Sequence, residues 1–116
     1  MNTEKSNLIV DLTLEFALDI IRYAEELESA RKFVVANQLL KSGTSIGANV
    51  NEAQNAESKQ DFIHKMKIAA KEVDETSYWL KLCKLAPTYP KPLNLDDKLL
   101  SIKNIISKII ITSKTK

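Results

Sequence analysis

The stretch SKQDFIHKMKIAAKEVDETSYWLKLC, residues 58–83, has the most regular hydrophobic pattern in the chain. Its small and apolar side chains recur at alternating steps of four and three residues, at Phe62, Met66, Ala69, Val73, Thr76, Leu80 and Cys83. This heptad spacing places all of them on one side of a helix and is typical of helices packed into bundles. Ser58 is suited to cap the helix at its N-terminus, with Asp61 as the acidic partner of a capping box. The pattern therefore predicts a long amphipathic helix over residues 59–85.

Three more helices are predicted, over residues 6–28, 30–55 and 96–113, from apolar side chains spaced by three and four residues. Three prolines between residues 87 and 92 separate the last two helices. The first helix has two apolar stripes side by side, and the second stripe contains Val10, Leu14, Ala17, Ile21 and Ala24. So wide an apolar surface indicates more than one packing partner. The expected fold is all-α: an antiparallel up-and-down four-helix bundle that forms a single domain over residues 1–116.

The composition agrees with an all-α fold. Only two glycines and three prolines occur among 116 residues, where average usage gives about eight and about six, so the turns of a many-stranded sheet protein are missing. The one cysteine, Cys83, cannot form an internal disulfide, and its place at the end of the heptad stripe favours a buried apolar role over that of a nucleophile. No uncharged run approaches the roughly 18 residues of a membrane span. We therefore expect a cytoplasmic protein with no membrane association.

Few residues suggest catalysis or metal binding. Asp61 and His64 have the i, i+3 spacing of half a di-iron bundle site, but such a site needs two histidines and the chain has one. Glu52, Glu72 and Glu75 could gather in the bundle, yet three carboxylates without a second histidine are weak evidence for a metal. No glycine-rich phosphate loop is present. We expect a protein that is not an enzyme and that has no metal or cofactor.

A line of polar residues runs beside the apolar stripe of the second helix, stepping by four and three residues through Gln38, Ser42, Ser45, Asn49 and Glu52. Serine and asparagine are mediocre helix formers, and a solvated face would more often carry lysine, glutamate or arginine. We therefore expect this polar line to lie in a helix–helix contact, within the protomer or between subunits. A solvated face is the alternative.

The third helix has a similar line, which contains Ile68, Glu72, Glu75 and Trp79. A tryptophan beside carboxylates fits a subunit interface, where tryptophan is enriched. Partial cover by its own bundle explains it equally well. We expect Glu72, Glu75 and Trp79 to belong to a packing or assembly surface together with the polar line.

Charge is unevenly distributed along the chain. Residues 1–58 have nine acidic and five basic groups, a net charge of −4, whereas residues 59–116 have six acidic and twelve basic groups, a net charge of +6. The side chains expected to bind nucleic acid are lysines of the third and fourth helices: Lys67, Lys71, Lys81, Lys98, Lys103 and Lys108. Lysine with little arginine indicates contact with the phosphate backbone and little base selectivity. A lysine-rich solvated face is the alternative interpretation.

Three segments carry a resemblance to a known family: QLLKSGTSIGANVNEA at residues 38–53, SKQDFIHKMKIA at 58–69 and EVDETSYWL at 72–80. They resemble the bacterial four helix bundle protein family, also called the 23S rRNA intervening-sequence protein family. The resemblance implies a four-helix bundle that assembles as a homopentamer, and it provides no catalytic residue. A related group, the accessory proteins of diversity-generating retroelements, forms a basic pentameric barrel that binds nucleic acid and a reverse transcriptase. RNA, DNA and a reverse transcriptase are therefore the partners that the resemblance implies besides further copies of the chain.

These observations lead to one expectation and one alternative. We expect a non-enzymatic, homo-oligomeric accessory or scaffold protein of the 23S rRNA intervening-sequence type that binds nucleic acid non-specifically through lysine-rich faces. The alternative is a protein–protein interaction module with no nucleic-acid affinity, whose lysines only maintain solubility.

Overall fold

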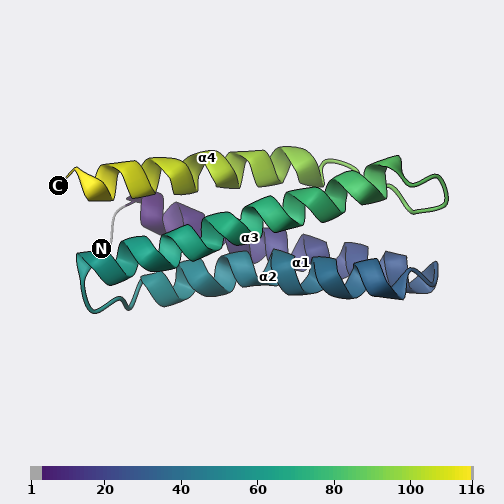
Figure 1. The fold of residues 1–116 in the computed structure, drawn as a ribbon, viewed down its shortest axis with the longest axis horizontal. Coiled ribbons are helices and arrows are strands. Elements are labelled where there is room, and N and C mark those ends of the chain that lie inside the picture. The colour runs from purple at the N-terminus through teal and green to yellow at the C-terminus, as the bar shows by residue number, and fades with distance from the viewer. Residues whose placement is uncertain (1–3, 116) are drawn as a thin grey trace.

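The structure is a computed structural model that describes the backbone of residues 4–115 and the side chains of residues 8–115. It has four α-helices, α1 (Glu4–Ser29), α2 (Phe33–Ala53), α3 (Lys59–Leu85) and α4 (Leu95–Lys114), and the described residues form no strand (Figure 1). The predicted all-α fold is confirmed. Proteins of this size with four long helices and short connections form bundles, because each helix can then bury its apolar side against its neighbours.

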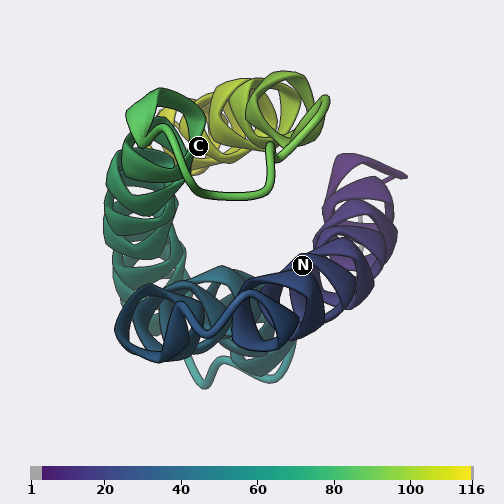
Figure 2. The same ribbon diagram turned by 90° about the vertical axis from the view of Figure 1, so that its right-hand side faces the viewer.

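Successive helices run antiparallel and pack in a cyclic order, α1 on α2, α2 on α3, α3 on α4 and α4 back on α1 (Figure 1). The backbones of the diagonal pairs, α1 with α3 and α2 with α4, are farther apart among the described residues, and these helices meet only through side chains in the core, as Tyr23 of α1 does with Cys83 of α3. The α4–α1 contact is the least extensive of the four, and the ring of helices is most open there when it is viewed along the bundle (Figure 2). Each helix therefore has two neighbours and turns an outer face to solvent.

The ends of α2 differ from the predicted range of 30–55. Arg31 adopts a left-handed conformation with φ of 63°, in which its amide and that of Lys32 donate to carbonyl oxygens of Glu28 and Leu27 at 2.9 and 2.8 Å. This Schellman motif ends α1 and delays α2 until Phe33. The other helix ends differ from prediction by two residues or fewer.

The predicted cap of α3 is confirmed. The Asp61 amide donates to Ser58 Oγ at 3.0 Å, and the Asp61 carboxylate accepts from the amide of Glu57 at 3.3 Å. At the other end of α3, Lys91 Nζ donates to the carbonyl oxygens of Lys84 and Ala86 at 3.2 and 2.8 Å. A cation at a helix C-terminus complements the helix dipole there, so the loop after α3 helps to terminate it.

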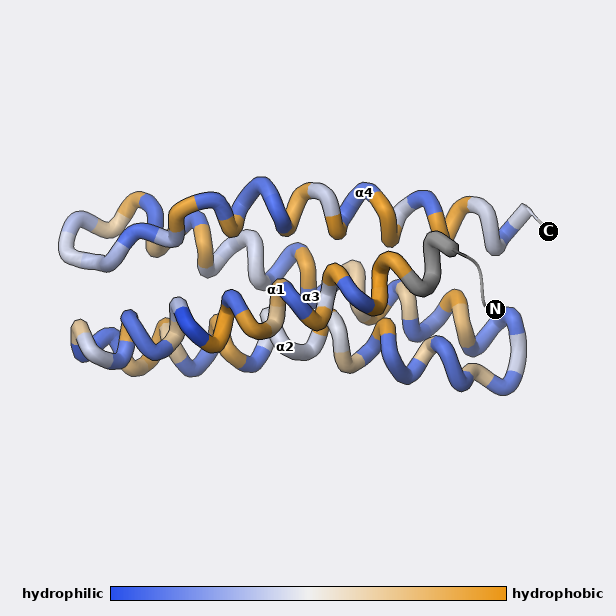
Figure 3. Tube along the Cα trace, turned by 180° about the vertical axis from the view of Figure 1, so that it is seen from behind, coloured by the Kyte–Doolittle hydropathy of each residue, from blue (hydrophilic) through white to orange (hydrophobic). Residues whose placement is uncertain are grey.

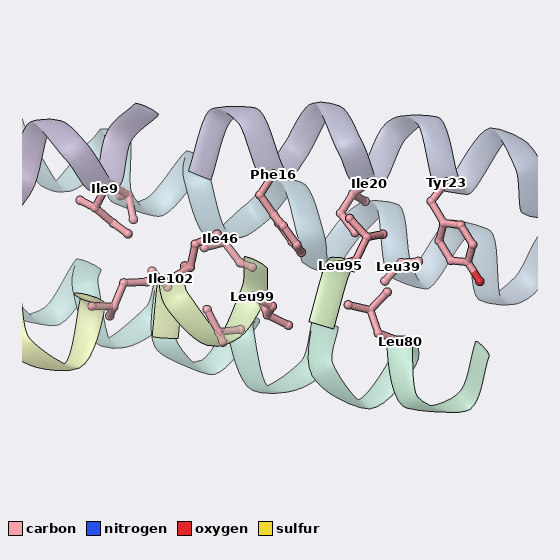
Figure 4. Packing of buried hydrophobic residues seen from close by; sticks show 14 of the residues in the cluster. Ile9, Phe16, Ile20, Tyr23, Leu39, Ile46, Leu80, Leu95, Leu99 and Ile102 are labelled. Atoms are coloured by element: carbon pink, nitrogen blue, oxygen red, sulfur yellow. The ribbon is translucent and has the colours of Figure 1, made fainter. Parts of the chain in front are cut away.

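All seven residues of the heptad stripe that begins at Phe62 are buried in the core. Hydrophobic residues recur at each turn of α4 on the side that faces the other helices (Figure 3). The largest core side chains come from every helix and converge on the bundle axis, as Phe16, Leu39, Leu80 and Leu99 show in Figure 4. The residues that α3 contributes to the core are therefore the ones that the three-and-four spacing predicts.

The loop between α3 and α4 is tied to the core by Tyr23. Its ring is buried, and its hydroxyl donates to the carbonyl oxygen of Pro90 at 2.6 Å. Burial and the neighbouring Cys83 thiol raise the pKa of the Tyr23 phenol above its usual value. The phenol is therefore held protonated, as the hydrogen bond to Pro90 requires.

Candidate functional site

The polar line of α2 follows the contact with α3. Ser42 is buried and accepts a hydrogen bond from the Thr76 hydroxyl at 3.0 Å, inside the core. At the far end of the line, Glu52 pairs with Lys65 at 3.1 Å on the surface. Two of the five polar residues thus reach across to α3 within one protomer.

The other three members of the line remain on α2. Ser45 and Asn49 are half-buried and bond to backbone carbonyl oxygens one turn earlier, at 2.7 and 2.9 Å, and Gln38 is exposed. These side chains lie along the outer edge of the contact between α2 and α3. The polar line therefore has two parts. Ser42 makes a buried contact that fixes the register of α2 against α3, and the other side chains form a polar edge that is open to solvent.

Trp79 lies on the partly exposed side of α3. Its ring is half-buried, its Nε1 donates to Glu75 Oε2 at 3.2 Å, and Tyr78 packs edge-on against it with ring centroids 5.2 Å apart. Burial, and then the Glu75 carboxylate, raise the pKa of Glu72, while Lys41 lowers it. This part of α3 thus has two neighbouring carboxylates beside an aromatic pair.

The six lysines expected to bind nucleic acid do not share one face. Lys67, Lys71 and Lys81 lie within about 80° of arc on the exposed side of α3, because each residue turns a helix by about 100°. Lys103 of α4 joins them, since it pairs at 3.5 Å with Asp74, which lies in the same arc. We call these four lysines the α3 lysine face.

Two lysines of α4 lie elsewhere. Lys98 pairs with Asp19 of α1 at 2.6 Å, so it faces the opposite neighbour. Lys108 is five residues after Lys103 and is therefore rotated by about 140° from the side of α4 that faces α3. The α4 lysines are thus spread around that helix.

A cleft of about 500 Å³ lies between α1 and α4, where the ring of helices is most open. Asp19 lines it, with its carboxylate shared between Arg22 at 3.1 Å and Lys98. Phe16 and Ile102 at its base are already buried within the core. The cleft is therefore a surface groove with an ion-paired carboxylate and a largely apolar lining that includes the exposed side chain of Leu18.

His64 is exposed, and the described residues contain no group of three His, Cys, Asp or Glu side chains suited to hold a metal ion. Cys83 is fully buried, and burial raises the pKa of its thiol, which disfavours the reactive thiolate. Within residues 4–115, no helix is long and apolar enough to cross a membrane.

The sequence interpretation missed one apolar stripe. Tyr78, Leu82 and Leu85 follow one another at steps of four and three on the exposed side of α3. That spacing was visible in the sequence, but the stronger heptad stripe on the opposite side of the helix concealed it. Leu14 and Ile21 of the second α1 stripe, which were expected to find a packing partner, are also exposed.

Comparisons with known proteins identify the fold family. The sequence profile described as "23S rRNA-intervening sequence protein" matches residues 5–110. The fold is similar to the crystal structure of a Bacteroides thetaiotaomicron protein of unknown function from the S23 ribosomal protein family, with 39% sequence identity and a TM-score of 0.87 over 92% of this chain and 98% of that one. A comparison with curated proteins finds no significant match. The chain belongs to the 23S rRNA-intervening sequence protein family.

Proposed function

We propose that this protein is a non-enzymatic, homo-oligomeric accessory or scaffold protein that binds the phosphate backbone of nucleic acid through the α3 lysine face. One observation carries the proposal: Lys67, Lys71 and Lys81 project from a single exposed arc, and none of the three has an ion-pair partner among residues 8–115. Unpaired ammonium groups on a rigid helix are ready to replace the counterions of a phosphate backbone.

The spacing of these lysines suits an extended polyanion. Lys67 and Lys81 are 14 residues apart, which is about 21 Å along a helix. Duplex DNA carries one negative charge per about 1.7 Å of axis, so many phosphates lie within that reach. Lysines without arginine forks attract phosphates and provide little base selectivity.

Assembly into an oligomer would strengthen the weak attraction between a single lysine face and the phosphate backbone. The family resemblance implies a homopentamer, in which a protomer charge of +2 becomes five times two, or +10. Several lysine faces on one particle bind the same strand with a gain in avidity that a monomer lacks. A scaffold role follows from such multivalency and needs no catalytic group.

The test is a titration of fluorescently labelled RNA and DNA duplexes with the protein, followed by anisotropy at low and moderate salt. Three neutralised phosphates per protomer predict a slope of log K against log salt of about −2.7 for duplex DNA. The double charge reversal Lys67→Glu with Lys71→Glu should weaken binding at least tenfold.

The matched control is Lys41→Glu with Lys108→Glu, which changes the net charge equally at two exposed lysines outside the α3 lysine face. It should weaken binding much less. Equal loss in both variants would show that overall charge, and not the α3 lysine face, governs binding. No binding by the wild-type protein at low salt would favour a protein–protein interaction module with solubilising lysines.

A further inference from the structure

Two exposed stripes of large apolar side chains have the same spacing on different helices. On α1, Leu14, Leu18 and Ile21 are 61%, 50% and 39% exposed. On α3, Tyr78, Leu82 and Leu85 are 58%, 38% and 72% exposed. Each set occupies positions i, i+4 and i+7, so each forms a straight stripe about 10 Å long on one helix face. We call them the α1 stripe and the α3 stripe.

One protomer cannot cover either stripe with the other. α1 and α3 are diagonal in the bundle and both stripes point away from the core, so the two stripes lie on different faces of the molecule. Contiguous exposed apolar side chains on a soluble protein indicate an interaction surface. Two stripes of matched length and spacing can pack together when they belong to two different copies.

Charge favours contact between unlike stripes. Asp11 and Glu25 continue the α1 stripe at its two ends, three residues before Leu14 and four after Ile21, and α1 as a whole has seven acidic and two basic groups. Two α1 stripes in contact would therefore bring like charges together.

The α3 stripe has basic neighbours. Lys71 is seven residues before Tyr78, Lys81 is beside the stripe, and α3 as a whole has six basic and four acidic groups. The nearest carboxylates are engaged: Glu75 accepts from Trp79, and Asp74 pairs with Lys103. An acidic α1 stripe thus complements the α3 stripe in charge as well as in shape.

We propose that copies of this chain associate head to tail, with the α1 stripe of one copy packed on the α3 stripe of the next. The inference rests on the homo-oligomer in the proposed function and assigns its interface. A contact between two different faces leaves a free α1 stripe at one end of the pair and a free α3 stripe at the other. Such heterologous contacts propagate until they close into a ring.

The test uses two variants with uncharged substitutions at exposed positions, which leave the core and net charge unaltered. One carries Leu14→Gln, Leu18→Gln and Ile21→Gln, and the other carries Tyr78→Gln, Leu82→Gln and Leu85→Gln. Circular dichroism checks that each remains helical, and light scattering measures the mass. The wild-type protein should be oligomeric, whereas each variant alone should have the protomer mass of 13.1 kDa.

The decisive sample is an equimolar mixture of the two variants. Each variant retains the stripe that the other lacks, so the mixture should form a heterodimer with twice the protomer mass. A contact between two α1 stripes, or between two α3 stripes, could not join the two variants into that heterodimer. A mixture that stays monomeric, or a variant that keeps the wild-type mass, would overturn the head-to-tail interface.

A control and an independent measurement separate this inference from the proposed function. Leu100→Gln with Ile111→Gln removes exposed apolar side chains of α4 outside both stripes and should keep the wild-type mass. A monomeric wild-type protein would refute both the homo-oligomer and its interface. An oligomer whose mass ignores both stripe variants would refute the interface alone, and nucleic-acid binding is measured separately by anisotropy.

Discussion

Gly43→Ala should destabilise the protein although alanine is the better helix former. Gly43 lies in the middle of α2 where that helix crosses α1, and a Cβ atom built there would be 2.8 Å from Cγ2 and 2.9 Å from Cγ1 of Ile20. Both atoms are bonded directly to the branched Cβ of Ile20, whose side chain is fully buried. A β-branched side chain has one strongly preferred rotamer in a helix, so Ile20 cannot swing away.

The magnitude follows from two opposing terms. Replacing glycine by alanine inside a helix gains about 1 kcal/mol. Overpacking a well-packed core costs about 1 to 3 kcal/mol. The cost here is in the upper part of that range, because the two close atoms are γ carbons that cannot move far from the backbone of α1. The net loss is about 1 kcal/mol of unfolding free energy, which lowers the melting temperature by about 4 °C.

A double-mutant cycle with Ile20→Ala tests this explanation by urea denaturation. Ile20→Ala alone costs about 2 to 5 kcal/mol, which a domain with a typical stability of about 5 to 15 kcal/mol can tolerate. Without the two γ carbons, Gly43→Ala should become stabilising by about 1 kcal/mol, so the two sites couple by about 2 kcal/mol. Gly47→Ala, whose nearest contacts are 3.3 Å from Thr13, is the control and should be nearer to neutral. A Gly43→Ala effect of the same sign and size in both backgrounds would refute the steric argument.

Three further outcomes are expected. Arg31→Gly should stabilise the protein by about 0.5 to 1 kcal/mol in urea titrations, because φ of 63° suits glycine and an exposed cation–π contact offsets little. Ser58→Ala should lower the unfolding free energy by about 1 kcal/mol, because the Asp61 amide loses its acceptor. Tyr23→Phe should cost about 1 kcal/mol at pH 7. Since the pKa of Tyr23 is higher in the folded chain than in the unfolded one, wild-type stability should be full below about pH 10 and fall above it, and the variant should lose less over that interval.

The core of α3 could be predicted residue by residue, whereas the outer stripe of α1 could not. Hydrophobic periodicity reports how much of a helix is apolar, and it does not report how many neighbours that helix has. The adjacent neighbours of α1 are α2 and α4, and their packing buries Ala24 of the second stripe while Leu14 and Ile21 remain exposed. The expectation that α1 has more than one packing partner is thus confirmed, although these partners leave part of the second stripe exposed.

The positions of the lysines show a second limit to what can be predicted from the sequence. Spacing along α3 was enough to place Lys67 and Lys71 on one face, because a helix has a fixed rotation per residue. Placement of the α4 lysines relative to that face depends on how α4 is rotated about its own axis in the bundle. The pair formed by Lys103 with Asp74 and the pair formed by Lys98 with Asp19 determine that rotation, and both join residues far apart in the sequence.

The exposed face of α3 is basic in its N-terminal half and apolar in its C-terminal half. Nucleic-acid binding and self-association would therefore use neighbouring parts of the same face. Its N-terminal half presents Lys67 and Lys71, whereas its C-terminal half presents the α3 stripe with Lys81 at its side. In a free protomer all three unpaired α3 lysines are open to phosphate, whereas in the assembly a neighbouring acidic α1 would compete for Lys81 and leave Lys67, Lys71 and Lys103 for phosphate. Salt should therefore act unequally, because phosphate binding depends on counterion release while a contact centred on apolar side chains depends on it weakly. Raising the salt concentration should release nucleic acid from an assembly that remains intact, and dissociation of the assembly at lower salt than the nucleic acid would contradict an apolar interface.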